Sequence, residues 1–259
     1  MWSKLARDSW LLFRRSWREG LRNPTLAFIL PIVIPLCFIT LISGILRDVV
    51  KLPGFPTATY VAWQAPGVVL LSAMMGAGYS AVALVVDAQS GYLDRLRLLP
   101  VHPLAIVLGR VVFDVVRVLP AALVVLIVSV ALGGELRTGV AGGLAILGLV
   151  AFWAAAYAAP FYALGLRTRN AQAPLAFLPL FVPLMFLSTV FTPTSMMPDW
   201  IKTASVWNPF TYIIEGARIF MTVPYSRVTL IKALAVATGV LVIGWYIAGR
   251  SYAALLRGD

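Results

Sequence analysis

The stretch DAQSGYLDRLRLLPVHP, residues 87–103, is the only long polar interruption in the middle of an otherwise apolar chain. The apolar run before it covers residues 61–86, and the run after it covers residues 104–132. Each run exceeds the roughly 18 apolar residues that a helix needs to cross a hydrocarbon core of about 30 Å. The polar stretch is therefore expected at a membrane surface, where a short amphipathic element offers a docking surface.

The composition of the whole chain indicates an integral membrane protein. Of its 259 residues, 61% are apolar, and the mean hydropathy is +0.90, whereas soluble domains are roughly 45 to 50% apolar. In lipid the backbone must satisfy its own hydrogen bonds, and long continuous apolar runs do so as helices rather than as barrel strands. The expected fold class is an all-α integral membrane protein.

The apolar runs predict six transmembrane helices in a single domain, residues 1–259. Prolines at positions 31 and 35 are expected to bend the first span, and three prolines make the fifth irregular. The expected spans are residues 25–46, 61–86, 104–132, 140–164, 174–191 and 229–248.

The distribution of basic residues predicts the orientation in the membrane. If the N-terminus is cytoplasmic, six spans place 14 of the 21 Lys and Arg residues on the inner side, as the positive-inside rule requires. We therefore expect a multi-pass protein of the cell membrane with both termini in the cytoplasm. Residues 87–103 are then cytoplasmic, and residues 192–228 face outward.

Residues 1–23 are expected to form an amphipathic helix that lies in the membrane interface. Large apolar side chains recur there every three or four positions, and six basic residues gather on another face. Tryptophan rings and cations suit the boundary between acyl chains and anionic head groups. The alternative is a solvated helix packed on a soluble partner. The residues expected at the interface are Trp10, Arg14, Trp17 and Arg18.

Residues 192–228 are too polar to span the membrane and too apolar to form a solvated loop. Four prolines divide this connection and leave short helical pieces near residues 199–206 and 209–221. We expect these to be short extracellular re-entrant helices between spans five and six. Glu215 and Arg218, three positions apart, can form an ion pair.

Three charged residues lie in the first turns of the third span. Arg110, Asp114 and Arg117 are spaced so that both arginines can reach the one carboxylate. An ion relay is one interpretation, because charges within membrane spans are usually functional. We favour side chains that snorkel from a position near the cytoplasmic end.

The sequence excludes several classes of enzyme. No GxxxxGK[ST] motif is present, so any ATP must be bound by a partner. The single histidine, His102, lies at a helix boundary, which excludes an HExxH protease and an intramembrane serine protease. Cys37, the single cysteine, excludes an internal disulfide and a cysteine metal cluster. We expect no catalytic residue, no metal site and no cofactor in this chain.

Other uses of a basic membrane protein are also disfavoured. The net charge of +11 lies beside the apolar spans and not in a groove with base-stacking aromatic residues, so we expect no nucleic acid partner. Ion-coupled carriers usually carry acidic residues near the centres of their spans and show two related halves. Neither feature is evident, which places the energy source on a separate subunit.

Three places in the chain resemble the membrane subunit of type-2 ABC exporters, the group that includes the daunorubicin-resistance permeases and the polysaccharide and lipid exporters. Residues 21–24, LRNP, are similar to the entry into the first span of that family. Residues 87–103 are similar to its cytoplasmic segment. Residues 197–200, MPDW, and residues 208–218, which begin NPFTY, are similar to its extracellular re-entrant element.

The resemblance implies an ATP-driven exporter assembled from several subunits. Two permease chains, identical or homologous, would assemble among membrane lipids with two copies of a cytosolic ABC ATPase, which would bind ATP and Mg. The N-terminal helix and residues 87–103 would contact the ATPase. The residues expected to couple ATP hydrolysis to the spans are Asp87, Gly91, Leu93, Asp94, Arg95, Leu96, Arg97 and Pro100.

The expected cargo is hydrophobic or amphiphilic, because the spans offer few polar groups to replace a hydration shell. A drug, a lipid or a lipid-linked glycan would leave the cytoplasm or the inner leaflet between the paired chains. Each lining residue can instead simply pack between helices. The expected substrate path comprises Met74, Met75, Tyr79, Phe177, Phe181, Met185 and Phe186. The extracellular gate that the family implies comprises Phe191, Phe210, Tyr212, Glu215 and Arg218.

A function of a different class stays open at the level of sequence. The chain can be a non-transporting membrane anchor or assembly protein, in which residues 87–103 only hold a cytosolic partner. ATPase activity of the purified complex separates the two functions.

Overall fold

The computed structural model describes residues 2–99, 101, 103–176, 181–222 and 224–257, with the backbone alone described at residues 2, 3, 93, 94, 97, 103, 104, 181 and 252–257. These residues form helices and turns and contain no strand, as the composition predicts. The helices are α1 (Trp2–Arg22), η1 (Thr25–Ile29), α2 (Leu30–Cys37), η2 (Phe38–Ile42), α3 (Ser43–Ile45), η3 (Arg47–Lys51), α4 (Tyr60–Gln89), α5 (Tyr92–Arg97), α6 (Pro103–Ala131), α7 (Gly139–Thr168), α8 (Ala173–Ala176), α9 (Phe181–Phe186), η5 (Thr194–Met196), α10 (Asp199–Trp207), α11 (Pro209–Met221) and α12 (Arg227–Arg257).

Five segments in the described residues are long and apolar enough to cross a membrane. They are Thr25–Ile45, α4, α6, α7 and α12, so the chain is a multi-pass membrane protein. The first of them combines α2 with π-helical turns on both sides, η1 and η2. A bend is predicted in this span because Pro31 and Pro35 lack the backbone N–H that a regular helix uses for hydrogen bonds. The missing donors account for the π-helical turns.

The structure does not show the expected span at residues 174–191 as one helix. α8 has four residues and α9 has six, residues 177–180 lie outside the described part of the chain, and residues 187–191 form turns. Pro183 within α9 removes a further hydrogen-bond donor. Five of the six expected spans therefore correspond to segments of sufficient length. The remaining one, residues 174–191, stays a prediction.

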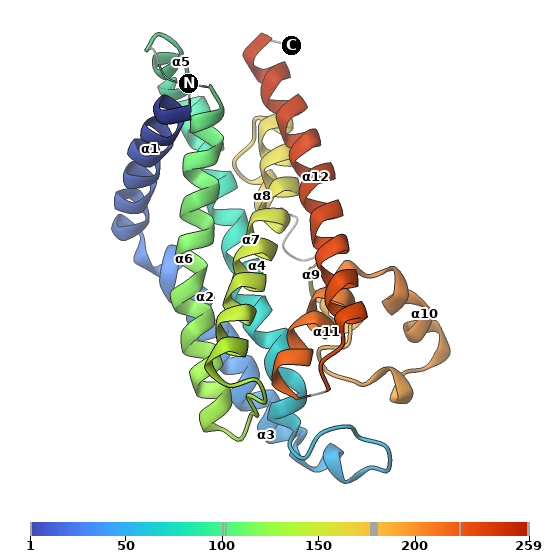
Figure 1. The fold of residues 1–259 in the computed structure, drawn as a ribbon. Coiled ribbons are helices and arrows are strands. Elements are labelled where there is room, and N and C mark those ends of the chain that lie inside the picture. Colours follow the sequence, from blue (N-terminus) through green and yellow to red (C-terminus); the bar gives the residue numbers. More distant parts are fainter. Residues whose placement is uncertain (1, 100, 102, 177–180, 223, 258–259) are drawn as a thin grey trace.

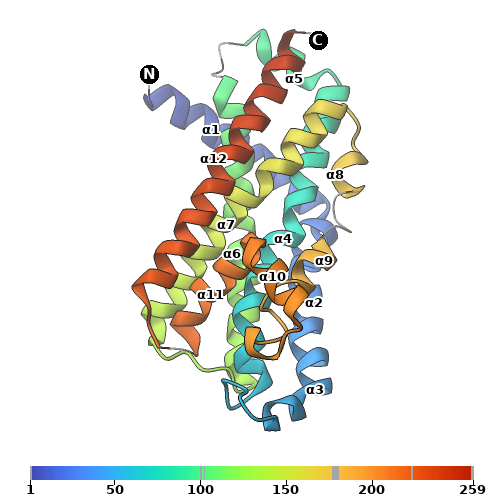
Figure 2. The same cartoon turned by 90° about the vertical axis from the view of Figure 1, so that its right-hand side faces the viewer.

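The helices form an elongated bundle around α4 (Figure 1). In the most apolar stretch of α4, 83% of the residues are buried, compared with 17% in α12 and 22% in the first span. α12 packs along α7, and α1 lies outside the bundle against α6. In Figure 2, α1 runs across the direction of the spans. α4 is thus the central helix, and any change in its position reaches most of the other helices.

Both termini and α5 lie at the same end of the bundle, the upper end in Figures 1 and 2. α8 and α9 descend from that end, and α11 lies in the lower half, from which α12 returns. At the lower end, the turn after α6 is fixed by the Thr59 hydroxyl, which donates to the Gly133 carbonyl at 2.9 Å. The Thr138 hydroxyl donates to the Phe220 carbonyl of α11 at 2.8 Å.

Several spans are longer than their apolar runs predict. α4 continues three residues into the polar stretch, α7 continues to Thr168, and α12 continues to Arg257. α4 ends where Gly91 adopts a φ of 69°, a left-handed conformation that favours glycine. In residues 192–228, α10 and α11 confirm the two short helices, while their re-entrant, extracellular placement stays a prediction.

Candidate functional site

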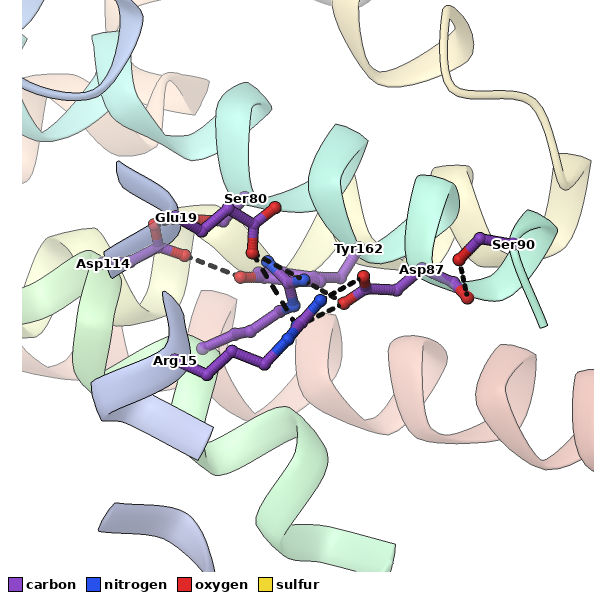
Figure 3. Close-up of polar contacts among 8 residues, drawn as sticks. Arg15, Glu19, Ser80, Asp87, Ser90, Asp114 and Tyr162 are labelled. Atoms are coloured by element: carbon purple, nitrogen blue, oxygen red, sulfur yellow. Dashed lines mark hydrogen bonds and ion pairs between the residues drawn. The ribbon is translucent and has the colours of Figure 1, made fainter. Parts of the chain in front are cut away.

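The last turn of α4 carries a carboxylate that lies inside the protein. Asp87 is only 6% exposed. Its two oxygens accept hydrogen bonds from the Arg15 guanidinium of α1, at 2.7 Å from Nη1 and 2.6 Å from Nη2. Arg110 of α6 donates to the same carboxylate. One side chain therefore joins α1, α4 and α6 (Figure 3).

Arg15 also links this carboxylate to α5. Its guanidinium carbon lies 4.0 Å from the centre of the Tyr92 ring, a cation–π contact. Glu19 Oε2 lies 3.7 Å from Arg15 Nη1 and 3.6 Å from Arg110 Nη2. Burial alone would lower the pKa of Arg15, but hydrogen bonding and attraction to Asp87 raise it, so Arg15 stays charged. We call Arg15, Glu19, Asp87 and Arg110 the Asp87 network.

A second buried carboxylate lies deeper in the bundle. Asp114 of α6 accepts hydrogen bonds from the Ser80 hydroxyl of α4 and, at 2.7 Å, from the Tyr162 hydroxyl of α7, as Figure 3 shows. Arg117 Nη2 donates to Asp114 at 2.7 Å and to the Gly76 carbonyl at 2.6 Å. Because the carboxylate and the guanidinium are paired with each other, their charges balance where α4, α6 and α7 meet. We call Ser80, Asp114, Arg117 and Tyr162 the Asp114 cluster.

These contacts correct the prediction for the charged residues of the third span. Arg110, Asp114 and Arg117 are each 3% exposed, so they do not snorkel to the surface. Arg117 alone pairs with Asp114, while Arg110 pairs with Asp87. The spacing along one helix shows which side chains share a face. It does not show that Asp87 of α4 lies close enough to bind Arg110.

The predicted coupling residues separate into inward-facing and outward-facing groups. Asp87 and Leu96 are buried, and Arg95 is exposed. Gly91 has open space around its Cα, and its positive φ is what requires glycine. Asp87 is therefore linked to α5 through Arg15 and does not present its carboxylate at the surface. The side chains of Leu93, Asp94 and Arg97, and Pro100 as a whole, lie outside the described residues.

The predicted interfacial residues of α1 also differ in their surroundings. Trp10, Arg14 and Arg18 are exposed. Trp17 is half-buried and packs edge-on against Phe28, with ring centres 5.4 Å apart. The membrane-facing role of α1 stays a prediction, because α1 also has a protein-facing side that rests on α6.

The described residues of the predicted substrate path differ in their surroundings, and the path stays a prediction. Met74 and Met185 belong to the hydrophobic core, and Met75 packs against it. Tyr79 is half-buried, whereas Phe186 is exposed. Phe177 and the side chain of Phe181 lie outside the described residues.

The aromatic residues of the predicted gate pack against different partners. Phe191 contacts Phe186, with ring centres 4.9 Å apart. Phe210 is buried against Trp153 of α7, at 5.3 Å between ring centres. The Tyr212 hydroxyl donates to the Val206 carbonyl of α10 at 2.8 Å. The extracellular gate therefore stays a prediction.

Arg218 of α11 is the centre of another buried contact. It is fully buried and pairs with Glu215, which confirms that prediction. Its guanidinium lies 3.5 Å from the centre of the Trp63 ring of α4 and donates to the Thr189 carbonyl at 2.7 Å. Arg218 thus fastens α11 to α4 in the half of the bundle away from the Asp87 network.

Arg15, Glu19, Ser80 and Tyr162 are functional candidates that the sequence prediction missed. Arg15 was one of six basic residues, and its partner lies 72 positions away. A usable signal was Asp87 itself, because a carboxylate that continues an apolar run requires a cation. The described residues contain no group of three or more His, Cys, Asp or Glu that could hold a metal ion.

Long apolar helices joined by buried ion pairs define a multi-pass membrane protein. Residues 7–222 match the family model of the ABC-2 type transporter. This match covers most of the chain, and the protein belongs to that family.

The relatives are modestly similar in sequence. The chain is 25% identical over 195 residues to the daunorubicin resistance ABC transporter permease protein DrrB1 of Streptomyces coeruleorubidus, over 74% of this chain and 66% of the relative. It is 26% identical over 189 residues to the probable doxorubicin resistance ABC transporter permease protein DrrC of Mycobacterium tuberculosis, over 73% and 68%. It is 28% identical over 201 residues to the putative transport permease ycf38 of Cyanophora paradoxa, over 70% and 67%. The matches span about two thirds of these relatives.

Proposed function

We propose that this chain is the permease subunit of an ATP-driven ABC exporter that moves a hydrophobic or amphiphilic substrate out of the cytoplasm or the inner leaflet. The observation that carries the proposal is the Asp87 network, which joins three helices at the point where the chain turns into α5. Membership of the ABC-2 type transporter family supports it. The names of two relatives, which refer to drug resistance, favour a drug-like cargo.

The geometry suggests how a force on α5 reaches the spans. α4 ends at Gln89 and α5 begins at Tyr92, so a displacement of α5 acts directly on the central helix. Arg15 stacks on Tyr92 and binds Asp87, so α1 follows the same displacement. The Asp114 cluster then passes the movement of α4 and α6 to α7.

The proposal includes partners and an orientation. Two copies of a cytosolic ABC ATPase would bind ATP and Mg and contact α5 and α1, and a second permease chain, identical or homologous, would complete the path. The end that carries both termini and α5 would be cytoplasmic, which agrees with the count of basic residues. The six-span topology and the re-entrant α10 and α11 belong to this proposal.

Reconstitution with the ATPase subunits tests the function. Asp94→Ala combined with Arg95→Ala removes one acidic and one basic residue from α5. Glu135→Ala combined with Arg137→Ala is the matched control, because this pair is exposed in the turn after α6. We expect the α5 variant to lose substrate-stimulated ATPase activity and export from proteoliposomes, and the control to keep both.

The outcomes separate the two functions. If the α5 variant assembles and exports normally, the coupling role of α5 is wrong. If the unmodified chain binds the ATPase but neither stimulates it nor exports any amphiphile, the membrane anchor is the correct function.

A further inference from the structure

We infer that the C-terminal half of α1 holds the phosphate group of an anionic lipid. A pocket of about 290 Å³ lies along this part of α1. Its described lining is entirely charged and comprises Arg15, Arg18, Glu19 and Arg22. A concave site lined by arginines suits a phosphate, because arginine donates several hydrogen bonds in a planar fork to phosphate oxygens. Arg15 is already bound to Asp87, so Arg18 and Arg22 are the arginines left to donate to it.

The charges around the pocket do not balance. The pocket and the Asp87 network together contain four arginines, at positions 15, 18, 22 and 110, and two carboxylates, Glu19 and Asp87. Both carboxylates are engaged with Arg15 and Arg110. Within the described part of the chain, Arg18 and Arg22 have no ion pair, and both are exposed. The two positive charges in excess therefore lie on Arg18 and Arg22, which both line the pocket.

The connectivity of the chain places these arginines at the membrane boundary. Thr25, where the first membrane-crossing segment begins, is only three positions after Arg22. A fully extended chain covers about 11 Å over that distance, so Arg22 lies at head-group level when the span is in the bilayer. Leu21 and Leu26 beside it are exposed and offer an apolar surface to acyl chains. These positions favour a lipid over a phosphate from solution.

The site also touches the proposed coupling residues. Arg15 lines the pocket and binds Asp87, and Glu19 lies between Arg15 and Arg110. A phosphate bound by Arg18 and Arg22 would therefore adjoin the Asp87 network and fix α1 in its present position. The lipid around the protein would then influence how firmly α1 follows α4.

Lipid binding to the full-length chain tests this inference. Native mass spectrometry of the detergent-solubilised chain measures retention of phosphatidylglycerol against phosphatidylcholine. The test variant is Arg18→Gln with Arg22→Gln. Arg7→Gln with Arg14→Gln is the matched control, since these residues are also exposed on α1 but do not line the pocket. Elution as a single species and the melting temperature without added lipid establish that each variant is folded.

We expect the test variant to bind phosphatidylglycerol about 10- to 30-fold more weakly, and the control to change less than about twofold. Equal losses in both variants would show a diffuse electrostatic attraction and overturn the site. Displacement of the lipid by millimolar inorganic phosphate or glycerol phosphate would show that the site binds a free phosphate and would overturn the assignment to a lipid. The assay needs no ATPase and no cargo, so its failure is distinguishable from failure of the proposed function.

Discussion

Neutralising Asp87 provides the sharpest test of the buried network. Asp87→Asn keeps the shape of the side chain but leaves two arginines without their carboxylate. Removing one partner of a buried ion pair destabilises a protein by about 3 to 5 kcal/mol. Arg110 is almost fully buried and bears most of this loss, whereas the Arg15 side chain is 35% exposed and is partly relieved by solvent. We therefore expect a loss near the lower end, about 3 kcal/mol.

A surface carboxylate supplies the matched control. Asp48 pairs with Lys51 at 2.6 Å, but its side chain is 64% exposed. Asp48→Asn should leave the stability nearly unchanged, because exposed ion pairs contribute little. The measurement is the unfolding of each variant in the same detergent or nanodisc, together with hydrogen exchange of the backbone of α5, which should become faster only in Asp87→Asn.

A double variant separates the buried charges from a change in shape. Asp87→Asn with Arg110→Gln removes the buried cation that the single variant leaves without its carboxylate, while Arg15 keeps Glu19. This double variant should be more stable than Asp87→Asn alone, because a buried unpaired charge is more unfavourable than a neutral group. If Asp87→Asn is no less stable than Asp48→Asn and exchange of α5 is unchanged, the Asp87 network does not hold α5 in place.

Three further substitutions test other buried contacts between the helices. Gly76→Ala places a methyl carbon 2.5 Å from Arg117 Nη2 and should displace it, with a loss of about 1 to 3 kcal/mol in the same unfolding assay. Gly109→Ala brings a methyl carbon within 3.0 Å of the α1 backbone and should loosen α1, detected as faster proteolysis of α1. Gly148→Ala, with no atom within 4 Å, is the control for both, and losses equal to its own would contradict the close contacts. Arg218→Gln removes a fully buried cation and should destabilise by about 2 to 4 kcal/mol; unaltered exchange in α11 would show that Arg218 does not fasten it.

Hydrophobic run lengths predict the helices of this protein well, because crossing a bilayer imposes length and backbone satisfaction on each segment. They predict helix ends less well. The run before residue 87 stops at Val86, yet α4 continues to Gln89 because Asp87 finds buried cations. The expected span at residues 174–191 stays a prediction, since its apolar composition is compatible with the short helices α8 and α9 as well.

The site was only partly predictable for a related reason. The sequence predicts that the stretch with Asp87 contacts an external partner, and that role stays a prediction. The Asp87 carboxylate itself binds Arg15 and Arg110 inside the chain. Local spacing also assigned Arg110 to Asp114. The observed partners come from α1 and α4, and contacts over 72 and 23 positions leave no periodic signal in the sequence.

The two carboxylate clusters constrain how α4 can move. Gly76, Ser80 and Asp87 are separated by four and seven positions, which places them on one face of α4. All three contact arginines or carboxylates of α6, along about 16 Å of helix at 1.5 Å per residue. Sliding α4 along α6 would break each contact and leave buried charges unpaired. We therefore expect α1, α4 and α6 to move as one body when α5 is displaced.

If α1, α4 and α6 move as one body, relative movement must occur at another helix contact of the bundle. The contact between α12 and α7 includes a close approach of small residues, since a methyl carbon added at Gly244 would lie 2.7 Å from Ala159. It also includes a ring contact between Trp245 and Tyr162, with centres 5.5 Å apart. It contains one hydrogen bond from a side chain in the described residues, from Trp245 Nε1 to the Ala155 carbonyl at 2.9 Å. Apolar helix surfaces in lipid can shift without leaving charges unpaired. The relative movement that opens a path should therefore occur at α12 and not between α4 and α6. A disulfide between cysteines placed on α4 and α6 should preserve transport, whereas one between α7 and α12 should block it.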